Sequence, residues 1–181
     1  MNCSLTLQKI YTSSLYAMGF IPIVLFLTGF LLLSALLSYH TLKNTYQSLH
    51  TLREALASSL PTYWQQLEAL FNTLPANLQE KEVSQALRPF LEKATSTQGF
   101  ERLFALEQEA FGSIQAFKQV LYKKEMQPSE ALAAALTAWK ESEKNIFTLK
   151  KRYLHTQKSY GKLLEQAPSA WVARLASFPK L

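Results

Sequence analysis

The segment from Leu15 to Leu37 contains no charged side chain and consists almost entirely of aliphatic and aromatic residues. About 20 apolar residues, at a rise of 1.5 Å per residue, cross a hydrocarbon core of roughly 30 Å. No other segment of the chain has this character. The sequence therefore predicts one transmembrane helix over residues 15–38, preceded by a short polar lead over residues 1–14.

Two other arrangements of the N-terminus fit the residues less well. The apolar region of a cleaved signal peptide is about 7 to 15 residues long and ends in a small-x-small site. The run here is longer, and its best candidate site, around Ser34 to Ser38, is poor. A lipid-modified cysteine follows an apolar signal region, whereas Cys3 precedes the run. We therefore expect an uncleaved anchor. Because Cys3 is the only cysteine, no intrachain disulfide or cysteine-based metal site can form.

Composition and charge restrict the classes of function. Glutamate supplies all 13 acidic residues, since the chain has no aspartate. EF-hand loops, aspartate-based magnesium sites and catalytic triads would therefore need unusual glutamate substitutes. From Lys140 onward nine Lys or Arg stand against three Glu, whereas residues 39–139 are nearly neutral. Basic clusters attract phosphate, so acidic lipid and nucleic acid are candidate partners of the C-terminal region.

The apolar pattern after the membrane run has helical spacing. Leu42, Leu49 and Leu56 lie seven residues apart, so the membrane helix is expected to continue into a soluble helix. Residues 58–61, Ser-Ser-Leu-Pro, predict a break and a restart, because serine caps helices and proline suits the first turn. The next helix is expected to have one apolar face, which carries Trp64, Leu67, Phe71, Leu74 and Leu78.

The middle of the chain predicts further helices separated by breaks. Pro75 and Pro89 predict kinks or short helices, because proline lacks an amide donor and clashes with the preceding turn. Residues 95–99 predict a loop, and residues 100–121 predict a helix with apolar positions three and four apart. Glu107 lies on the apolar face of that helix. A single glutamate there is more often a device that fixes helix register than a metal ligand.

Residues 127–129 predict a boundary, and residues 130–166 predict the longest soluble helix. Its seam has coiled-coil spacing and consists of Ile146, Leu149, Tyr153, Thr156, Tyr160 and Leu163. Pro168 is expected to end this helix. Ser169 is expected to cap a last short helix, which bears Trp171, Val172, Leu175 and Phe178.

Strand signals are nearly absent, so the predicted fold class is all-α. We expect an N-terminal transmembrane helix followed by an antiparallel helical bundle with a short C-terminal helix, because amphipathic helices must bury their apolar stripes against one another. Residues 39–181 are expected to form a single bundle domain.

The titratable residues do not predict a catalytic or metal site. His40, His50 and His155 are scattered, whereas a metal site needs several converging ligands. We expect these histidines to be interfacial or solvated. Glutamates two residues apart, such as Glu80 and Glu82, point in different directions on a helix. The sequence therefore predicts no enzymatic activity and no cofactor.

The basic residues of the last long helix lie off its seam and are candidate contacts for a partner protein or lipid. They are Lys150, Lys151, Arg152, Lys158 and Lys162. Tyr153 and Tyr160 lie on the seam, which favours core packing over base stacking, so we expect no nucleic-acid partner. The helix with Trp171 and Arg174 either lies in a membrane interface or closes the bundle.

The last third of the chain has a recognisable pattern of residues. It comprises Glu143, Ile146, Lys150, Lys151, Tyr153, Tyr160, Leu164, Pro168, Ser169, Ala173, Leu175 and Phe178. In these residues the chain resembles the LemA family of bacterial membrane-anchored helical proteins, with Lys150 and Lys151 in place of paired arginines. The resemblance implies an anchor in the bacterial inner membrane, a cytoplasmic bundle, no established enzymatic activity, and partners that differ among members.

Orientation and function stay hypotheses from the sequence. Lys9 and the amino terminus nearly balance Lys43 and Arg53 across the anchor, so the positive-inside rule decides little. The basic C-terminal region suits an anionic inner leaflet and favours a cytoplasmic bundle. The first hypothesis is a non-enzymatic adaptor or scaffold. The alternatives are a ligand-binding or enzymatic pocket near Tyr153, Tyr160 and Trp171, and self-assembly through the heptads.

Overall fold

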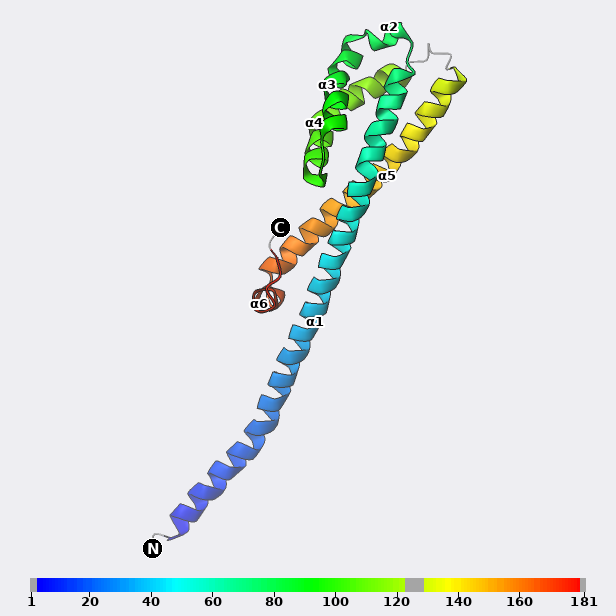
Figure 1. Cartoon of the computed structure of the whole chain (residues 1–181). Coiled ribbons are helices and arrows are strands. Elements are labelled where there is room, and N and C mark those ends of the chain that lie inside the picture. The colour runs from blue at the N-terminus through cyan, green and yellow to red at the C-terminus, as the bar shows by residue number, and fades with distance from the viewer. Residues whose placement is uncertain (1–2, 123–128, 180–181) are drawn as a thin grey trace. The chain divides into compact units, whose positions relative to one another are not determined.

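The computed structural model describes residues 3–122 and 129–179, with the backbone alone for residues 3–19 and 77. All regular structure in these residues is α-helical, as predicted. Figure 1 shows the helices, which are α1 (Cys3–Asn72), α2 (Ala76–Gln79), α3 (Glu82–Ser96), α4 (Phe100–Tyr122), α5 (Glu130–Glu165) and α6 (Ser169–Leu175). Of the predicted boundary at 127–129, residues 127 and 128 lie outside the described residues.

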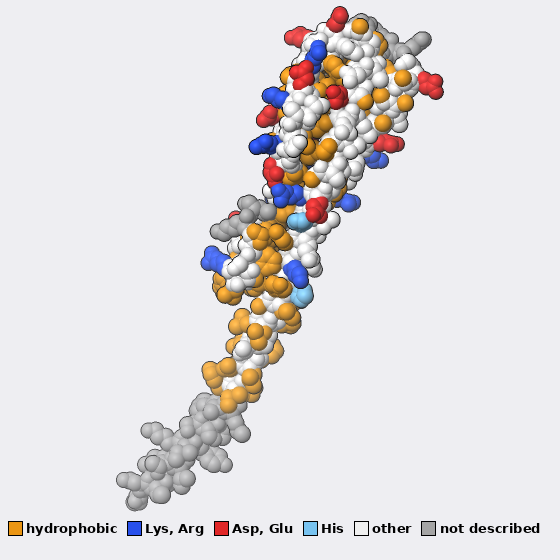
Figure 2. Space-filling view, in the orientation of Figure 1, with side chains coloured by type: hydrophobic (Ala, Val, Ile, Leu, Met, Phe, Trp, Pro, Cys, Tyr) orange, Lys and Arg blue, Asp and Glu red, His pale blue; other side chains and the backbone are white. Residues whose placement is uncertain are grey.

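The N-terminal part of α1 is long and apolar enough to cross a membrane. Its most apolar window of 18 residues has a mean hydropathy of 2.6, and none of that window is buried. Large apolar side chains from Phe20 to Leu37 are exposed around the helix. Figure 2 shows hydrophobic side chains gathered on this segment, with charged side chains elsewhere. The predicted anchor is therefore a continuous helix, and between residues 20 and 37 its large apolar side chains are covered by no other described part of the chain.

The chain divides into two compact units. The bundle unit contains the described part of residues 48–157, and the juxtamembrane unit contains the described parts of residues 1–47 and 158–181. Residues 39–181, expected as a single bundle domain, are thus shared between two units. The reason is that the seam of α5 packs into one apolar cluster up to Tyr153 and into a separate cluster from Tyr160 onward.

Helices of the bundle unit alternate in direction. Lys118 of α4 pairs with Glu143 of α5, and Glu107 of α4 pairs with Lys150 of α5, so these helices are antiparallel. The ring of Phe117 in α4 lies 6.3 Å from that of Phe71 in α1. The core residues of the bundle unit in α1 are Leu56, Leu60, Tyr63, Trp64, Leu67, Leu70 and Phe71. Those that follow α1 are Leu74, Leu78, Leu87, Leu91, Ala94, Leu103, Leu106, Ala110, Ile114, Phe117, Leu121, Leu132, Trp139 and Ile146.

The predicted break at Ser58, Ser59 and Pro61 is wrong, because α1 continues through these residues to Asn72. Pro61 is exposed, and buried Leu56, Leu60, Tyr63, Trp64 and Leu67 lie before and after it on one apolar stripe. Burial of that stripe outweighs the missing amide of one proline, since tertiary packing overrides local propensity. The hydroxyl of Ser58 donates to the Ala55 carbonyl within the helix instead of capping a new one.

Two other predictions about breaks have different outcomes. Pro75 precedes the four-residue helix α2, as expected for a short helix. Pro89 lies inside α3 without dividing it, again on an exposed face.

The predicted loop at 95–99 is confirmed over residues 97–99, where Gly99 has a φ of 97° that a side chain would strain. The helix predicted over residues 100–121 is α4.

The juxtamembrane unit has a small apolar cluster next to the end of the predicted anchor. Leu42 of α1, Tyr160 of α5 and Ala173 of α6 are its buried members. The ring of Phe178 lies 5.8 Å from that of Tyr39. The Tyr160 hydroxyl donates to the Pro179 carbonyl at 2.9 Å, and burial, followed by the neighbouring Tyr46, raises the pKa of Tyr160.

Ser169 does not cap α6 as predicted. It is the first residue of α6, and its hydroxyl donates to the Gln166 carbonyl at 2.8 Å. Pro168 occupies the cap position and α5 has already ended at Glu165, so the predicted end of the long helix is correct to within one residue. Because Ser169 lies inside the first turn and not at the cap position, its hydroxyl bonds back to the preceding turn, and α6 has no side-chain cap.

Candidate functional site

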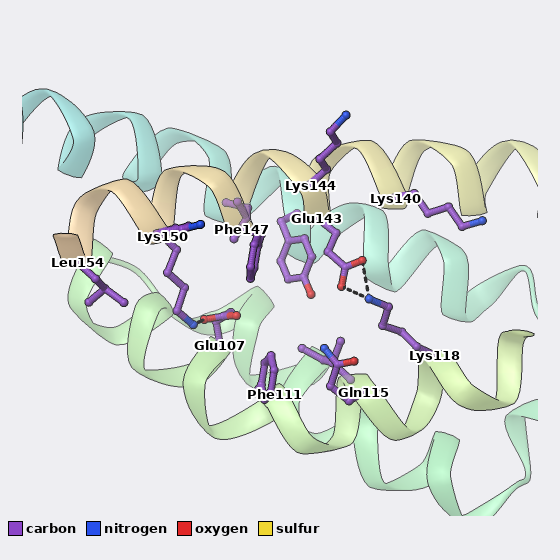
Figure 3. Close-up of a pocket in the computed structure, with 14 residues that line it drawn as sticks. Glu107, Phe111, Gln115, Lys118, Lys140, Glu143, Lys144, Phe147, Lys150 and Leu154 are labelled. Atoms are coloured by element: carbon purple, nitrogen blue, oxygen red, sulfur yellow. Dashed lines mark hydrogen bonds and ion pairs between the residues drawn. The ribbon is translucent and has the colours of Figure 1, made fainter. Parts of the chain in front are cut away.

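A groove of about 650 Å³ lies between α4 and α5 in the bundle unit. Tyr63 of α1 also lines it, and the close-up in Figure 3 shows the lining side chains. Phe111 of α4 and Phe147 and Leu154 of α5 are 51%, 67% and 42% exposed. Apolar side chains of this size, exposed together along one groove, are typical of a surface that another molecule covers.

Two ion pairs cross the groove and hold α4 against α5 (Figure 3). The Lys118 ammonium lies 2.8 and 2.9 Å from the two carboxylate oxygens of Glu143. Lys150 pairs with Glu107, which is only 7% exposed. The prediction that Glu107 lies on the apolar face is confirmed, and its partner comes from the opposite helix. Both carboxylates are thus neutralised inside the groove.

Tyr63 is the buried polar group at the floor of the groove. Burial is the main cause that raises its pKa, and the negative charges of Glu143 and Glu107 raise it further. Both effects favour the neutral, protonated form of the phenol. With both carboxylates in ion pairs, the groove offers binding contacts and no evident acid–base pair.

Further cations lie along the α5 side of the groove. Lys140, Lys144 and Lys151 line it, and all three are exposed. The Lys140 ammonium lies 4.9 Å from the centroid of the Tyr122 ring. Within the described part of the chain, neither Lys144 nor Lys151 forms an ion pair. Figure 3 shows Lys144 extending away from the ion pairs. The groove therefore combines an exposed apolar strip with free positive charge.

The residues predicted to contact a partner protein or lipid lie in different parts of the structure. Lys150 is half-buried and paired with Glu107, and its role as a partner or lipid contact stays a prediction. Lys151 lines the groove, and Arg152 is exposed outside its lining. Lys158 and Lys162 are exposed on the juxtamembrane unit, as are Trp171 and Arg174 of α6.

Residues of the family pattern mostly serve as packing residues. Ile146 is buried in the core of the bundle unit, and Tyr153 packs against it beside Phe100 and Phe104. Tyr160 belongs to the other cluster and Trp171 is exposed. None of Tyr153, Tyr160 and Trp171 lines the groove, so the pocket expected near these three residues is not the cavity found here.

Sequence reasoning missed Phe111, Phe147 and Lys144. The detectable signal was a pair of large aromatic residues off the predicted seams, in helices whose polar faces are otherwise charged.

His40, His50 and His155 are exposed, as expected, and His50 lies 3.3 Å from Glu54. Among the described residues, no three His, Cys, Asp or Glu side chains lie close enough together to hold a metal ion.

Comparison with known proteins gives no assignment, since no family model, no curated protein and no solved structure matches this chain.

Proposed function

We propose that this chain is a single-pass membrane protein that acts as a non-enzymatic adaptor, and that its groove between α4 and α5 binds an acidic amphipathic helix of a partner protein. The observation that carries the proposal is the exposed strip of Phe111, Phe147 and Leu154 beside unpaired Lys144 and Lys151. A helix that lies in an apolar groove supplies apolar residues three and four apart. Acidic residues on its flanks complement the lysines.

The groove is suited to binding without large rearrangement. Its floor belongs to the bundle core through Ile114 and Ile146, and its two ion pairs fix the spacing of α4 and α5. A preorganised groove loses little conformational entropy when a partner binds. Positive charge at the rim favours acidic partners and speeds their association at low salt.

The proposal places the bundle unit on the cytoplasmic side of a bacterial inner membrane. The resemblance to the LemA family supports this placement, and so does the excess of Lys and Arg after Lys140. Self-association through the same groove is the competing proposal, because the chain itself offers long amphipathic helices.

The test is site-specific photocrosslinking of the full chain in its native membrane. A benzophenone amino acid replaces Phe147, and the crosslinked peptide is identified by mass spectrometry. The charge variant combines Lys144→Glu with Lys151→Glu. The matched control combines Lys81→Glu with Lys93→Glu, two exposed lysines outside the groove that give the same change in net charge.

We expect one discrete adduct at an acidic amphipathic segment of another protein. It should fall at least about tenfold in the charge variant and stay constant in the control. A crosslink to a second copy of this chain would replace the adaptor proposal with self-association. The absence of an adduct, or one equally strong in both double variants, would reject the groove as the binding site.

A further inference from the structure

The two faces of α6 have opposite environments. Ala170 and Ala173 are buried, whereas Trp171 is 63% and Leu175 is 87% exposed. Trp171 and Leu175 are four residues apart and therefore share one face of the helix, with exposed Arg174 beside them. The small side chains thus seat α6 on its own unit, and the large apolar ones point outward.

Packing within the juxtamembrane unit holds α6 directly after the predicted membrane span. Ala173 is buried in one cluster with Leu42, and Phe178 contacts Tyr39. Residues 39–42 follow the end of the uncharged run by only a few residues, or roughly 3–8 Å along a helix. The headgroup region on each side of the hydrocarbon core is about 5–8 Å thick. With residues 15–38 across a bilayer, the outward face of α6 would lie at the depth of the lipid headgroups.

Charge around α6 is complementary to an anionic surface. In residues 39–47 and 158–179 the cations are Lys43, Lys158, Lys162 and Arg174, all exposed, and the single carboxylate side chain is Glu165. None of these cations forms an ion pair within the described residues. At the end of the predicted span, in the same unit, the apolar side chains of Leu36, Leu37 and Tyr39 are exposed as well.

We propose that α6 is a second membrane contact, in which Trp171 and Leu175 insert among the headgroups of an anionic bilayer while Arg174, Lys158 and Lys162 bind lipid phosphates. Tryptophan suits this depth because its ring is apolar and its indole N–H donates a hydrogen bond. A short helix with an apolar face and basic flanks lies in the interface plane. This contact is independent of the groove between α4 and α5.

The arrangement of the tryptophans makes the proposal measurable in the full chain. Trp64 and Trp139 are buried in the bundle unit, at 4% and 0% exposed, so Trp171 is the exposed tryptophan. The chain is reconstituted in vesicles of phosphatidylcholine and phosphatidylglycerol whose acyl chains are brominated near the headgroup. Fluorescence quenching by bromine is compared between the parent chain and Trp171→Phe.

We expect a quenched component in the parent chain that is absent in Trp171→Phe. It should be reduced at least about twofold by Leu175→Glu, which opposes insertion, but not by Ala134→Glu, an exposed position of the bundle unit with the same charge change. It should also be weaker in vesicles of phosphatidylcholine alone, and equal quenching in both would overturn the role of the cations.

Two results would overturn the membrane contact itself. In the first, Trp171 is not quenched by bromine and is fully open to aqueous acrylamide, so water covers this face. In the second, Trp171 is protected from both quenchers, so a second copy of the chain covers it. Circular dichroism of each variant confirms that the helices are retained.

Discussion

The two units of this chain differ in how much of their apolar surface they bury. The bundle unit covers its own stripes, since residues of α1 to α5 form one continuous core. The apolar cluster of the juxtamembrane unit has Leu42, Tyr160 and Ala173 as its buried members, and the large apolar side chains of α1 between residues 20 and 37 are exposed. The difference lies in sequence pattern, because the first part of α1 is apolar on all faces and the later part only on one stripe. The bundle unit buries its apolar stripes within itself, whereas the exposed apolar surface of residues 20–37 is long enough to cross a membrane.

The largest expected effect tests whether each unit is stabilised by its own packing. Trp139 is fully buried in the bundle core, so Trp139→Ala should lower the free energy of unfolding of the bundle unit by about 3–5 kcal/mol. Leu42→Ala, in the other cluster, should change it by less than about 0.5 kcal/mol. Urea unfolding of the full chain in mild detergent, followed by hydrogen exchange, measures both. Equal losses would mean that the units unfold together.

The second prediction concerns the buried end of the groove. Lys150→Ala leaves Glu107 unpaired at 7% exposure, which should cost about 2–3 kcal/mol of stability. Lys151→Ala removes an exposed neighbouring lysine and should cost less than about 0.5 kcal/mol. The double variant Glu107→Leu with Lys150→Met should recover most of the loss. A similar cost for Lys150→Ala and Lys151→Ala would show that the pair is not stabilising.

The third prediction is a pH dependence of the stability of the bundle unit. The pKa of Tyr63 is raised in the folded state, so the unfolded state loses the phenolic proton first as pH rises. The contribution of the buried Tyr63 phenol to the free energy of unfolding is complete below about pH 10, the ordinary tyrosine pKa. Above that pH it declines by up to about 1.4 kcal/mol per pH unit. The slope of stability against pH above 10 should be smaller in Tyr63→Phe than in the parent chain. Identical slopes would contradict the assignment.

The smallest effect should be seen in the juxtamembrane unit. Tyr160→Phe removes the hydrogen bond to the Pro179 carbonyl, with an expected cost of about 0.5–1.5 kcal/mol. Amide exchange should become faster in residues 158–175 and stay unchanged in residues 48–72. Tyr46→Phe is the control, because Tyr46 contacts the same ring without that hydrogen bond. Faster exchange in both regions would indicate that the two units are coupled.

Much of the helical architecture could be predicted because apolar spacing decides it. Leu42, Leu49 and Leu56 are buried as expected, and residues 100–121 lie in the helix α4. In the seam of α5, Ile146 and Tyr160 are buried, and the other members, Leu149, Tyr153, Thr156 and Leu163, are half-buried. The error at Pro61 arose because local break signals were weighed without the stripe that continues past them. An exposed proline lacks one amide hydrogen bond, whereas the stripe buries several large side chains.

The candidate site was less predictable because it depends on pairs of residues distant in sequence. Glu107 and Lys150 each lie on a helix whose position was foreseen, but spacing within one helix does not reveal which residue faces it across the groove. For the same reason, the ion pair of Lys150 could not be read from its position off the seam of α5. The exposure of Phe111 and Phe147 likewise depends on how α4 and α5 are rotated against each other.

The most direct test of the central contrast is cysteine labelling in sealed membrane vesicles. In a Cys3→Ser background, Leu33→Cys places a thiol on the apolar segment and Lys151→Cys places one on the bundle unit; both parent residues are exposed in the protein alone. A water-soluble maleimide should label Lys151→Cys on one side of the membrane and should label Leu33→Cys only after denaturation. Equal labelling of both thiols in intact vesicles would contradict the account, because water and not lipid would then surround the apolar helix.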